Sequence, residues 1–270
     1  MSLLLLGAGP VTDAAGGGGD FGPELVSNGG FDSGDDWSLG GSGPPTISGG
    51  ALRGAGTSEG SAFQPVAITA GKIYRLSYTI VSITTGFVDI EVGLNVSSQR
   101  SAAGDYVEYI VAGAADSNIG VALPSFTDAV VDNVSLKEVL VQDDYSAEWW
   151  PQPAFNASTG LTIVQCSVTG GKLQIAAPGL TWRARIASNP AALVANDVFV
   201  YSIDVEATDG ASSINFAVGG AQVQLGTTAG TKAGKVRTPA TNQFIQITEA
   251  GDVTATIDNV SIKKVNLPPL

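Results

Sequence analysis

Few side chains in this sequence could do chemistry, and their types favour binding over catalysis. Histidine is absent from all 270 residues, which removes the commonest general base, the Ser–His nucleophile pair and the commonest metal ligand. Cys166 is the single cysteine, so it forms no intrachain disulfide. No imidazolium is available to activate its thiol. We therefore expect Cys166 to be a small residue of the core.

Carboxylates are the remaining candidates for catalysis. Glycoside hydrolysis needs two of them, and Asp105, Glu108 and Glu206 are available. No spacing or flanking sequence distinguishes a pair, and acidic residues are expected throughout a chain whose formal net charge is −12. We predict that the protein is not an enzyme.

Two aspartates stand in a sequence context that raises a physical question. Asp132 and Asp258 each begin an Asp-Asn-Val-Ser segment. In an alternating strand Asp132, Val134 and Leu136 share a face, and we expect that face to point inward. A core-facing carboxylate is costly unless it is satisfied. Backbone N–H groups are one answer, and a structural Ca²⁺ is the other, since hard cations take oxygen ligands.

Aromatic side chains are the candidates for stacking on a sugar. They are Trp149, Trp150 and Trp182 in the second half of the chain and Tyr106, with Tyr109, in the first. Adjacent residues of an extended chain point to opposite sides, so one of Trp149 and Trp150 is expected to be exposed or to cover a domain junction. The alternative is that the tryptophans are core or interface residues.

An internal repeat defines the elements that must position these residues. Residues 131–139 match residues 257–265 at six of nine positions, about 126 residues apart. Three earlier segments match in the same order, although the offset changes slightly: 46–52 with 167–173, 73–80 with 198–205, and 88–93 with 214–219. Repeats of this kind indicate duplicated structural units.

The matching segments are typical of β-strands. They are short, rich in Val, Ile, Tyr and Phe, and bounded by turn residues. The Gly-Gly pairs at 49–50 and 170–171 are placed as hairpin turns are. We predict an all-β protein of two tandem β-sandwich (jelly-roll) domains with an extended N-terminal arm. The expected boundaries are 1–20 for the arm with its Gly-rich linker, 21–141 for the first domain and 142–270 for the second. The short polar join at 142–144 predicts that the domains abut.

The first domain resembles the carbohydrate-binding modules of family 4/9 and related jelly rolls. The resemblance rests on the segment Glu24-Leu25-Val26-Ser27-Asn28-Gly29-Gly30-Phe31-Asp32, on Trp37, and on the closing Asp132-Asn133-Val134. It implies a structural calcium held by Asp32 and Asp132. The second domain keeps the closing motif but opens with Pro153-Ala154-Phe155-Asn156, so any calcium is expected in the first domain.

The N-terminus carries an apolar run at Leu3, Leu4, Leu5 and Leu6, followed by a glycine-rich stretch. The run lacks a basic n-region and is too short to span a membrane, so a signal peptide fits poorly. We expect these leucines to pack on another subunit, a frayed tail being the alternative. The opening nine residues also resemble the start of small virion proteins from tailed bacteriophages.

Two functions follow from these observations. The first is a non-enzymatic virion structural or decoration protein of a tailed bacteriophage, on the capsid, collar or tail. It would be a homo-oligomer that binds other virion proteins through its arm and contacts host glycans. The alternative is a secreted, extracellular carbohydrate-binding or adhesin module. With 13 basic residues spread along the chain, neither nucleic acid nor a membrane surface is an expected partner.

Overall fold

The computed structural model describes residues 20–54, 56–113, 117–150, 155, 161–163, 166–177, 182–186, 193–209, 213–239, 245–249 and 253–270, with only the backbone of 161–163, 176–177, 182–186, 207 and 249. The described elements are all β-strands, paired antiparallel in two sandwiches of one six-stranded and one five-stranded sheet each. This confirms the predicted all-β fold class. No described helix is long and apolar enough to cross a membrane. The predicted assembly residues Leu3, Leu4, Leu5 and Leu6 lie outside the described residues.

The N-terminal sandwich contains β1 to β11. Its six-stranded sheet has the order β3-β4-β11-β6-β9, with β1 also paired to β11, and its five-stranded sheet has the order β2-β5-β10-β7-β8. The strands are β1 (Phe21–Glu24), β2 (Ser38–Gly40), β3 (Thr46–Ile47), β4 (Leu52–Arg53), β5 (Gly60–Pro65), β6 (Ile73–Thr85), β7 (Asp89–Val92), β8 (Asn95–Val96), β9 (Gly104–Val111), β10 (Asn118–Leu123) and β11 (Asp128–Val139).

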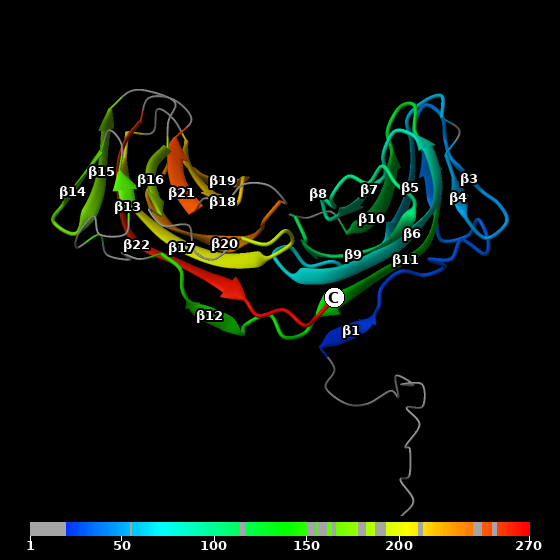
Figure 1. Ribbon diagram of the computed structural model, residues 1–270, viewed down its shortest axis with the longest axis horizontal. Helices are drawn as coiled ribbons and strands as arrows, with labels where there is room; N and C mark the ends of the chain where they lie inside the picture. The colour runs from blue at the N-terminus through cyan, green and yellow to red at the C-terminus, as the bar shows by residue number, and fades with distance from the viewer. Residues whose placement is uncertain are drawn as a thin grey trace, which may run out of the picture.

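The C-terminal sandwich repeats this arrangement with β12 to β22 (Figure 1). Its sheets have the orders β14-β15-β22-β17-β20, with β12 paired to β22, and β13-β16-β21-β18-β19. The strands are β12 (Tyr145–Glu148), β13 (Leu161–Ile163), β14 (Cys166–Thr169), β15 (Lys172–Ala177), β16 (Trp182–Ile186), β17 (Val198–Thr208), β18 (Ile214–Val218), β19 (Ala221–Gly226), β20 (Gly230–Arg237), β21 (Ile245–Glu249) and β22 (Val253–Val265).

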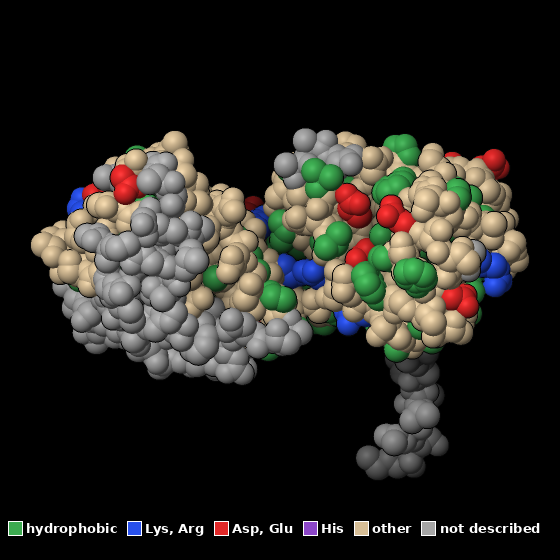
Figure 2. All heavy atoms as spheres, turned by 90° about the horizontal axis from the view of Figure 1, so that it is seen from above, with side chains coloured by type: hydrophobic (Ala, Val, Ile, Leu, Met, Phe, Trp, Pro, Cys, Tyr) green, Lys and Arg blue, Asp and Glu red, His purple; other side chains and the backbone are tan. Residues whose placement is uncertain are grey.

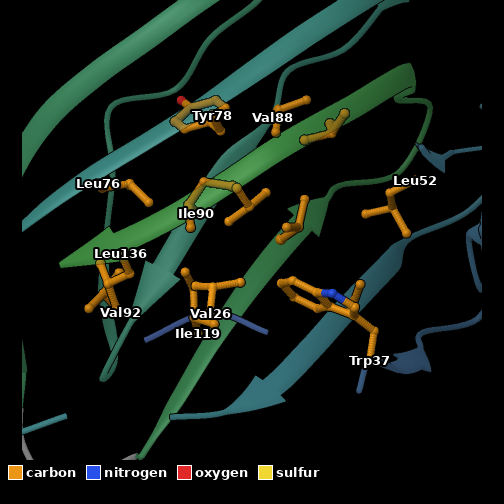
Figure 3. Packing of buried hydrophobic residues seen from close by; sticks show 14 of the residues in the cluster. Val26, Trp37, Leu52, Leu76, Tyr78, Val88, Ile90, Val92, Ile119 and Leu136 are labelled. Atoms are coloured by element: carbon orange, nitrogen blue, oxygen red, sulfur yellow. The ribbon is translucent and has the colours of Figure 1, made fainter. Parts of the chain in front are cut away.

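Each sandwich has its own apolar core, made by alternate residues of the two facing sheets. In the N-terminal sandwich Trp37, Leu76, Ile90 and Ile119 point toward one another from four different strands or loops (Figure 3). Phe31 is fully buried and its ring centroid lies 4.9 Å from that of Trp37. Cys166 is half-buried and packs against the core of the C-terminal sandwich, in keeping with its expected role there.

The Asp-Asn-Val motif marks a β-bulge in the strand that forms the centre of each six-stranded sheet. Register along β11 shifts between Asp132 and Ser135, and Asn133 adopts a left-handed conformation with φ of 54°. The extra residue changes the face presented by the rest of the strand. Val131 and Val134 are therefore buried while Asp132 is half-buried. The prediction that Asp132 faces the core with Val134 was wrong, because strict alternation does not hold across a bulge.

Replacing Asn133 with valine should destabilise the N-terminal sandwich by about 1–2 kcal/mol. Asparagine tolerates the left-handed region better than other residues with a Cβ, and a β-branched residue is strained there. Asn133→Gly is the matched control, because glycine adopts this backbone conformation without a Cβ clash. Chemical denaturation measures both variants, and equal losses for valine and glycine would contradict the role of the backbone conformation.

One glutamate in each sandwich, for which no role was predicted, holds the opening strand in place. Glu24 Oε1 accepts hydrogen bonds from the backbone N–H of Leu25, Val26 and Leu136, and its Oε2 accepts from Ser135 Oγ. Glu148 makes the corresponding bonds in the second sandwich, to Trp150, Ile262 and Ser261. The segments Glu24-Leu25-Val26 and Glu148-Trp149-Trp150 are thus equivalent, which places the two tryptophans where the first copy has Leu25 and Val26.

The two sandwiches meet along a junction that has an apolar cluster of its own (Figure 1). The strands β9 and β20, which are edges of the two six-stranded sheets, lie beside each other there. Tyr109 donates a hydrogen bond from its hydroxyl to the Pro268 carbonyl, which ties the C-terminal tail to the first sandwich. The buried members of this junction cluster are Ile73, Tyr109, Val111, Val139, Val198 and Val265.

Candidate functional site

The three carboxylates considered for hydrolysis lie apart, and each has a partner. Asp105 accepts a 2.7 Å hydrogen bond from Thr79 Oγ1, and Glu206 pairs with Lys172 in the other sandwich. Glu108 lies three residues from Asp105 on β9, so their side chains leave the strand on opposite faces. These contacts bring no two of the three together as an acid and a base.

Asp32 and Asp132, the predicted calcium ligands, both lie near Gly30. A Cβ at Gly30 would be 3.8 Å from Asp32 Oδ2 and 3.9 Å from Asp132 Oδ1. Asp132 Oδ1 also accepts a 2.7 Å hydrogen bond from the Asn133 N–H. Among the described residues, no three His, Cys, Asp or Glu side chains come together as metal ligands. Calcium binding stays a prediction, and it would require further oxygen ligands from the backbone or amides.

Chelation tests that prediction. If calcium binds the folded loop, removing it should lower the melting midpoint of the N-terminal sandwich, because a ligand of the folded state stabilises that state. The C-terminal sandwich is the internal control, since Asn156 stands in its sequence where the first copy has Asp32. An unchanged midpoint in the presence of chelator would count against a structural calcium.

The aromatic candidates are mostly committed to packing. Trp150 is 1% exposed within the core, with its ring 6.2 Å from Phe155. Trp149 is half-buried and meets Phe199 edge-on at 4.9 Å. Both side chains pack on the same core cluster at the start of the sandwich, so neither is fully exposed, and the alternative that the tryptophans are core residues holds for Trp150. Trp150 offers no ring face to a ligand, which corrects its assignment as a glycan platform.

The three other aromatic candidates for glycan stacking are Trp182, Tyr109 and Tyr106. The side chain of Trp182 lies outside the described residues. Tyr109 is 3% exposed and belongs to the junction cluster. The ring of Tyr106 is half-buried, with the Arg100 guanidinium carbon 4.8 Å from its centroid, and its hydroxyl donates to the Ala102 carbonyl. Glycan stacking by Tyr106 stays a prediction, although Arg100 covers part of that ring.

A different surface combines an aromatic ring with polar side chains: the outward face of the five-stranded sheet of the N-terminal sandwich. Phe63 on β5 lies opposite Gly120 on β10, and Gly120 lies opposite Glu91 on β7. A Cβ at Gly120 would meet two Phe63 ring carbons at 2.6 and 2.7 Å, so the ring lies over the glycine. Asp89, also on β7, is 8% exposed. Burial raises the pKa of Asp89, and a hydrogen bond from the Gln99 side chain opposes that rise.

The equivalent face of the C-terminal sandwich is rich in amides. Ala217 on β18 lies between Gln222 on β19 and Gln246 on β21. Asn215 and Gln224 lie opposite each other in the next row. The register places Ala217 where the first copy has Glu91, and Gln222 where it has Val96. Figure 2, seen from the side on which the five-stranded sheets lie in Figure 1, shows acidic and hydrophobic side chains together on the first sandwich.

A groove of about 380 Å³ separates these two faces. Its walls include Asn95 and Val96 from β8 and Gln222 and Val223 from β19. Its floor comes from the edge strands β9 and β20, including Arg237. Figure 2 shows basic side chains at this waist between the sandwiches. The groove therefore lies between the outward faces of the two five-stranded sheets and is lined by residues of both sandwiches.

A buried ion pair crosses the junction beneath the groove. Arg237, from the C-terminal sandwich, donates through Nη1 to Glu108 and through Nη2 to the Val96 carbonyl at 3.1 Å. Glu108 has no exposed side-chain surface, and it also accepts hydrogen bonds from the N–H and Oγ of Ser98 at 3.1 and 3.0 Å. Sequence reasoning weighed Glu108 as a catalytic acid, whereas the structure gives it a partner from the other domain.

Tyr78 lies beside this ion pair, and its buried hydroxyl makes no hydrogen bond of good geometry, although Ser97 and Arg100 lie close enough to oppose the rise of its pKa. Burial raises the pKa of Tyr78 to about 12, with the nearby Glu108 charge adding to the rise. A buried hydroxyl whose hydrogen bonds are poorly formed contributes little to stability. Tyr78→Phe is therefore expected to leave stability at neutral pH unchanged or to raise it by up to about 1 kcal/mol.

The same substitution should change the dependence of stability on alkaline pH. The folded state favours the neutral phenol, so this contribution to stability is fully present below about pH 10, the ordinary pKa of tyrosine. It is lost as the pH rises from about 10 to about 12, where the folded protein also begins to ionise at Tyr78. Denaturant unfolding between pH 9 and 12 should show a flatter profile for Tyr78→Phe than for the unmodified protein. Parallel profiles would contradict the assignment.

Comparisons with known proteins identify no family for this chain. No known protein family matches it, and no curated protein matches it. Among solved structures, an anti-sigma factor domain-containing protein is 10% identical with a TM-score of 0.21, covering 79% of this chain and 84% of that one. The cycloalternan-forming enzyme from Listeria monocytogenes, in complex with a pentasaccharide substrate, is 14% identical with a TM-score of 0.28, covering 82% and 21%. Allantoicase from Saccharomyces cerevisiae is 8% identical with a TM-score of 0.22, covering 79% and 80%. Similarities this weak carry no argument about function.

Proposed function

We propose that this protein is a non-enzymatic structural or decoration protein of a tailed-bacteriophage particle, which displays its two sandwiches as a single unit and contacts host glycans. The observation that carries the proposal is the junction. An apolar cluster, the Glu108–Arg237 ion pair and the Tyr109–Pro268 hydrogen bond hold the two sandwiches together. A pair of domains fixed in this way suits display on a particle surface.

The residue inventory supports binding in preference to catalysis. The sequence has no histidine, and the candidate carboxylates Asp105, Glu108 and Glu206 are engaged separately. The outward sheet faces instead offer a ring, two carboxylates and several amides, which are groups that bind without reacting. The resemblance of the opening nine residues to phage virion proteins supports the location.

Deletion of residues 1–20 tests the particle role. The truncated chain should fold, because the described sandwiches begin at Phe21, but it should no longer form oligomers or enter the particle. Light scattering and particle incorporation in a complementation assay measure these outcomes. Incorporation at the level of the full chain would contradict attachment through Leu3, Leu4, Leu5 and Leu6.

A secreted carbohydrate-binding or adhesin module is the second candidate. It is favoured by the Phe63 ring, which lies over Gly120 beside Glu91 on an outward face. For such a module, the same truncation should preserve glycan affinity and remove no other property. Glycan affinity retained by the truncated chain, with no particle association in the full chain, would favour this alternative.

A further inference from the structure

We propose that the outward faces of the two five-stranded sheets and the groove between them form one composite site for a linear, uncharged oligosaccharide that lies across both sandwiches. This inference rests on the proposed contact with glycans and specifies where and how that contact is made. It differs from two separate sites because its centre, the groove, requires residues of both domains.

The strand registers place the side chains of this site in one continuous row. In the N-terminal sandwich the row runs from Phe63 past Gly120 and Glu91 to Val96. Neighbouring strands are about 4.8 Å apart, so this half of the row spans about 14 Å. In the C-terminal sandwich the corresponding row begins at Gln222 and continues past Ala217 to Gln246.

The two half-rows meet at the groove. Val96 ends the first half-row and Gln222 begins the second, and both line the same groove. The Val96 side chain is exposed, with 52% of its surface accessible. Because the junction is held by the Glu108–Arg237 ion pair and the junction cluster, the two half-rows keep a fixed relation. A long ligand can therefore engage both without an ordering cost for the domains.

The side chains of the row suit a sugar polymer. The Phe63 ring provides an apolar platform beside the Glu91 carboxylate. Gln222 is exposed, and its amide can both donate and accept hydrogen bonds, as hydroxyl groups require. Between Gln222 and Gln246, Ala217 is 2% exposed, so its small side chain lies below the surface formed by its neighbours, and a ligand would rest on those neighbours.

Charge and hydrogen bonding narrow the class of ligand. Glu91 and Asp89 lie on the N-terminal half, whereas Lys235 and Arg237 line the groove, so charges of both signs follow the row and a polymer with charge of one sign would be repelled along part of it. An extended peptide would need free backbone groups along β8, but the Val96 carbonyl already accepts a hydrogen bond from Arg237. An uncharged oligosaccharide satisfies both conditions.

The test measures binding of linear neutral oligosaccharides of graded length to the intact protein. A glycan array of glucan, mannan, xylan and N-acetylhexosamine series selects the series, and calorimetry compares its short and long members. Chains long enough to engage both half-rows should bind at least tenfold more tightly than chains that cover one, because the second contact is intramolecular. Val96→Trp, at an exposed position, should fill the groove and remove this advantage of length.

Side-chain variants test the polar contacts. Gln222→Ala should weaken binding of the long chain about fivefold, the effect of one hydrogen bond. The matched control is Gln174→Ala, since Gln174 lies on β15 in the six-stranded sheet and bonds Thr256. Equal effects of the two substitutions, or affinities independent of chain length, would overturn the composite site while leaving glycan contact intact. An array with no bound glycan would overturn both the composite site and the proposed contact with glycans. Attachment to the particle is judged separately, by the deletion of residues 1–20.

Discussion

Replacing Arg237 with alanine should lower the free energy of unfolding by about 3 kcal/mol and separate the unfolding of the two sandwiches. The cause is Glu108, whose carboxylate has no exposed surface and would lose its closest cationic partner. Arg100 compensates only in part, because its Nη2 is 3.8 Å from Glu108 Oε1, an ion-pair contact that is too long for a hydrogen bond. A buried charge that loses its closest partner retains its desolvation cost and loses most of the compensating attraction.

Denaturant unfolding followed by intrinsic fluorescence measures this effect, since tryptophans lie in both sandwiches. Glu108→Gln and the double variant complete a mutant cycle, which isolates the interaction between the two side chains. Arg53→Ala is the matched control, because Arg53 bonds the Ser48 carbonyl within a single hairpin at the surface. A single transition with an unchanged midpoint in Arg237→Ala would show that the ion pair does not hold the junction.

The strands and their duplication could be predicted because those features are local. Gly49-Gly50 and Gly170-Gly171 do form the turns of the β3–β4 and β14–β15 hairpins, each with positive φ at both glycines. Phe31 and Phe155 occupy matching buried positions, both with positive φ. Alternation failed only where the chain departs from regular geometry. The bulge at Asn133 moved Asp132 out of the core, and nothing in the spacing of apolar residues reports one inserted residue.

The candidate site was not predictable in the same way, because its residues meet only through sheet pairing. Phe63 and Gly120 are far apart in sequence and become neighbours through the β5–β10 register. One feature of β5 could have indicated the site. Ala62 and Gln64 are buried, so Phe63 between them faces outward, where a large apolar side chain is unusual. Glu108 and Arg237 belong to different domains, so their pairing required the junction itself.

The two copies keep their fold while exchanging individual partners. Thr79 donates to Asp105 in the first sandwich, and in the second the same pair of strands carries Asp204 and Thr231, with donor and acceptor exchanged between strands. The equivalent of Glu108 on β20 is Gly234, where the Tyr201 ring fills the space that a side chain would occupy. Only the first copy therefore has a buried glutamate at this position. The junction is asymmetric because Glu108 of the first sandwich pairs with Arg237 of the second, with no equivalent pair formed through Gly234.

Gly29 and Gly30, adjacent in the opening loop, should differ sharply in their response to an added methyl group. Gly29→Ala should destabilise the N-terminal sandwich by about 3 kcal/mol, whereas Gly30→Ala should change its stability little. A Cβ at Gly29 would overlap the Val134 carbonyl oxygen and lie 3.0 Å from the Val134 carbonyl carbon. The Gly29 carbonyl also accepts a 2.9 Å hydrogen bond from the Val134 N–H, so the loop cannot move away without losing that bond. Forced overlap with backbone is costly because neither side can rotate aside.

Gly30 is the matched control, because its added Cβ would meet only the Asp32 and Asp132 carboxylate oxygens at ordinary contact distances. Thermal and chemical unfolding of both variants should show a lower midpoint for the N-terminal transition in Gly29→Ala alone, with the C-terminal transition unchanged. Equal effects at the two positions would mean that the cost comes from general loss of loop flexibility. A selective effect at Gly29 would instead show that close backbone packing holds the opening loop against Val134 on β11, independently of any bound calcium.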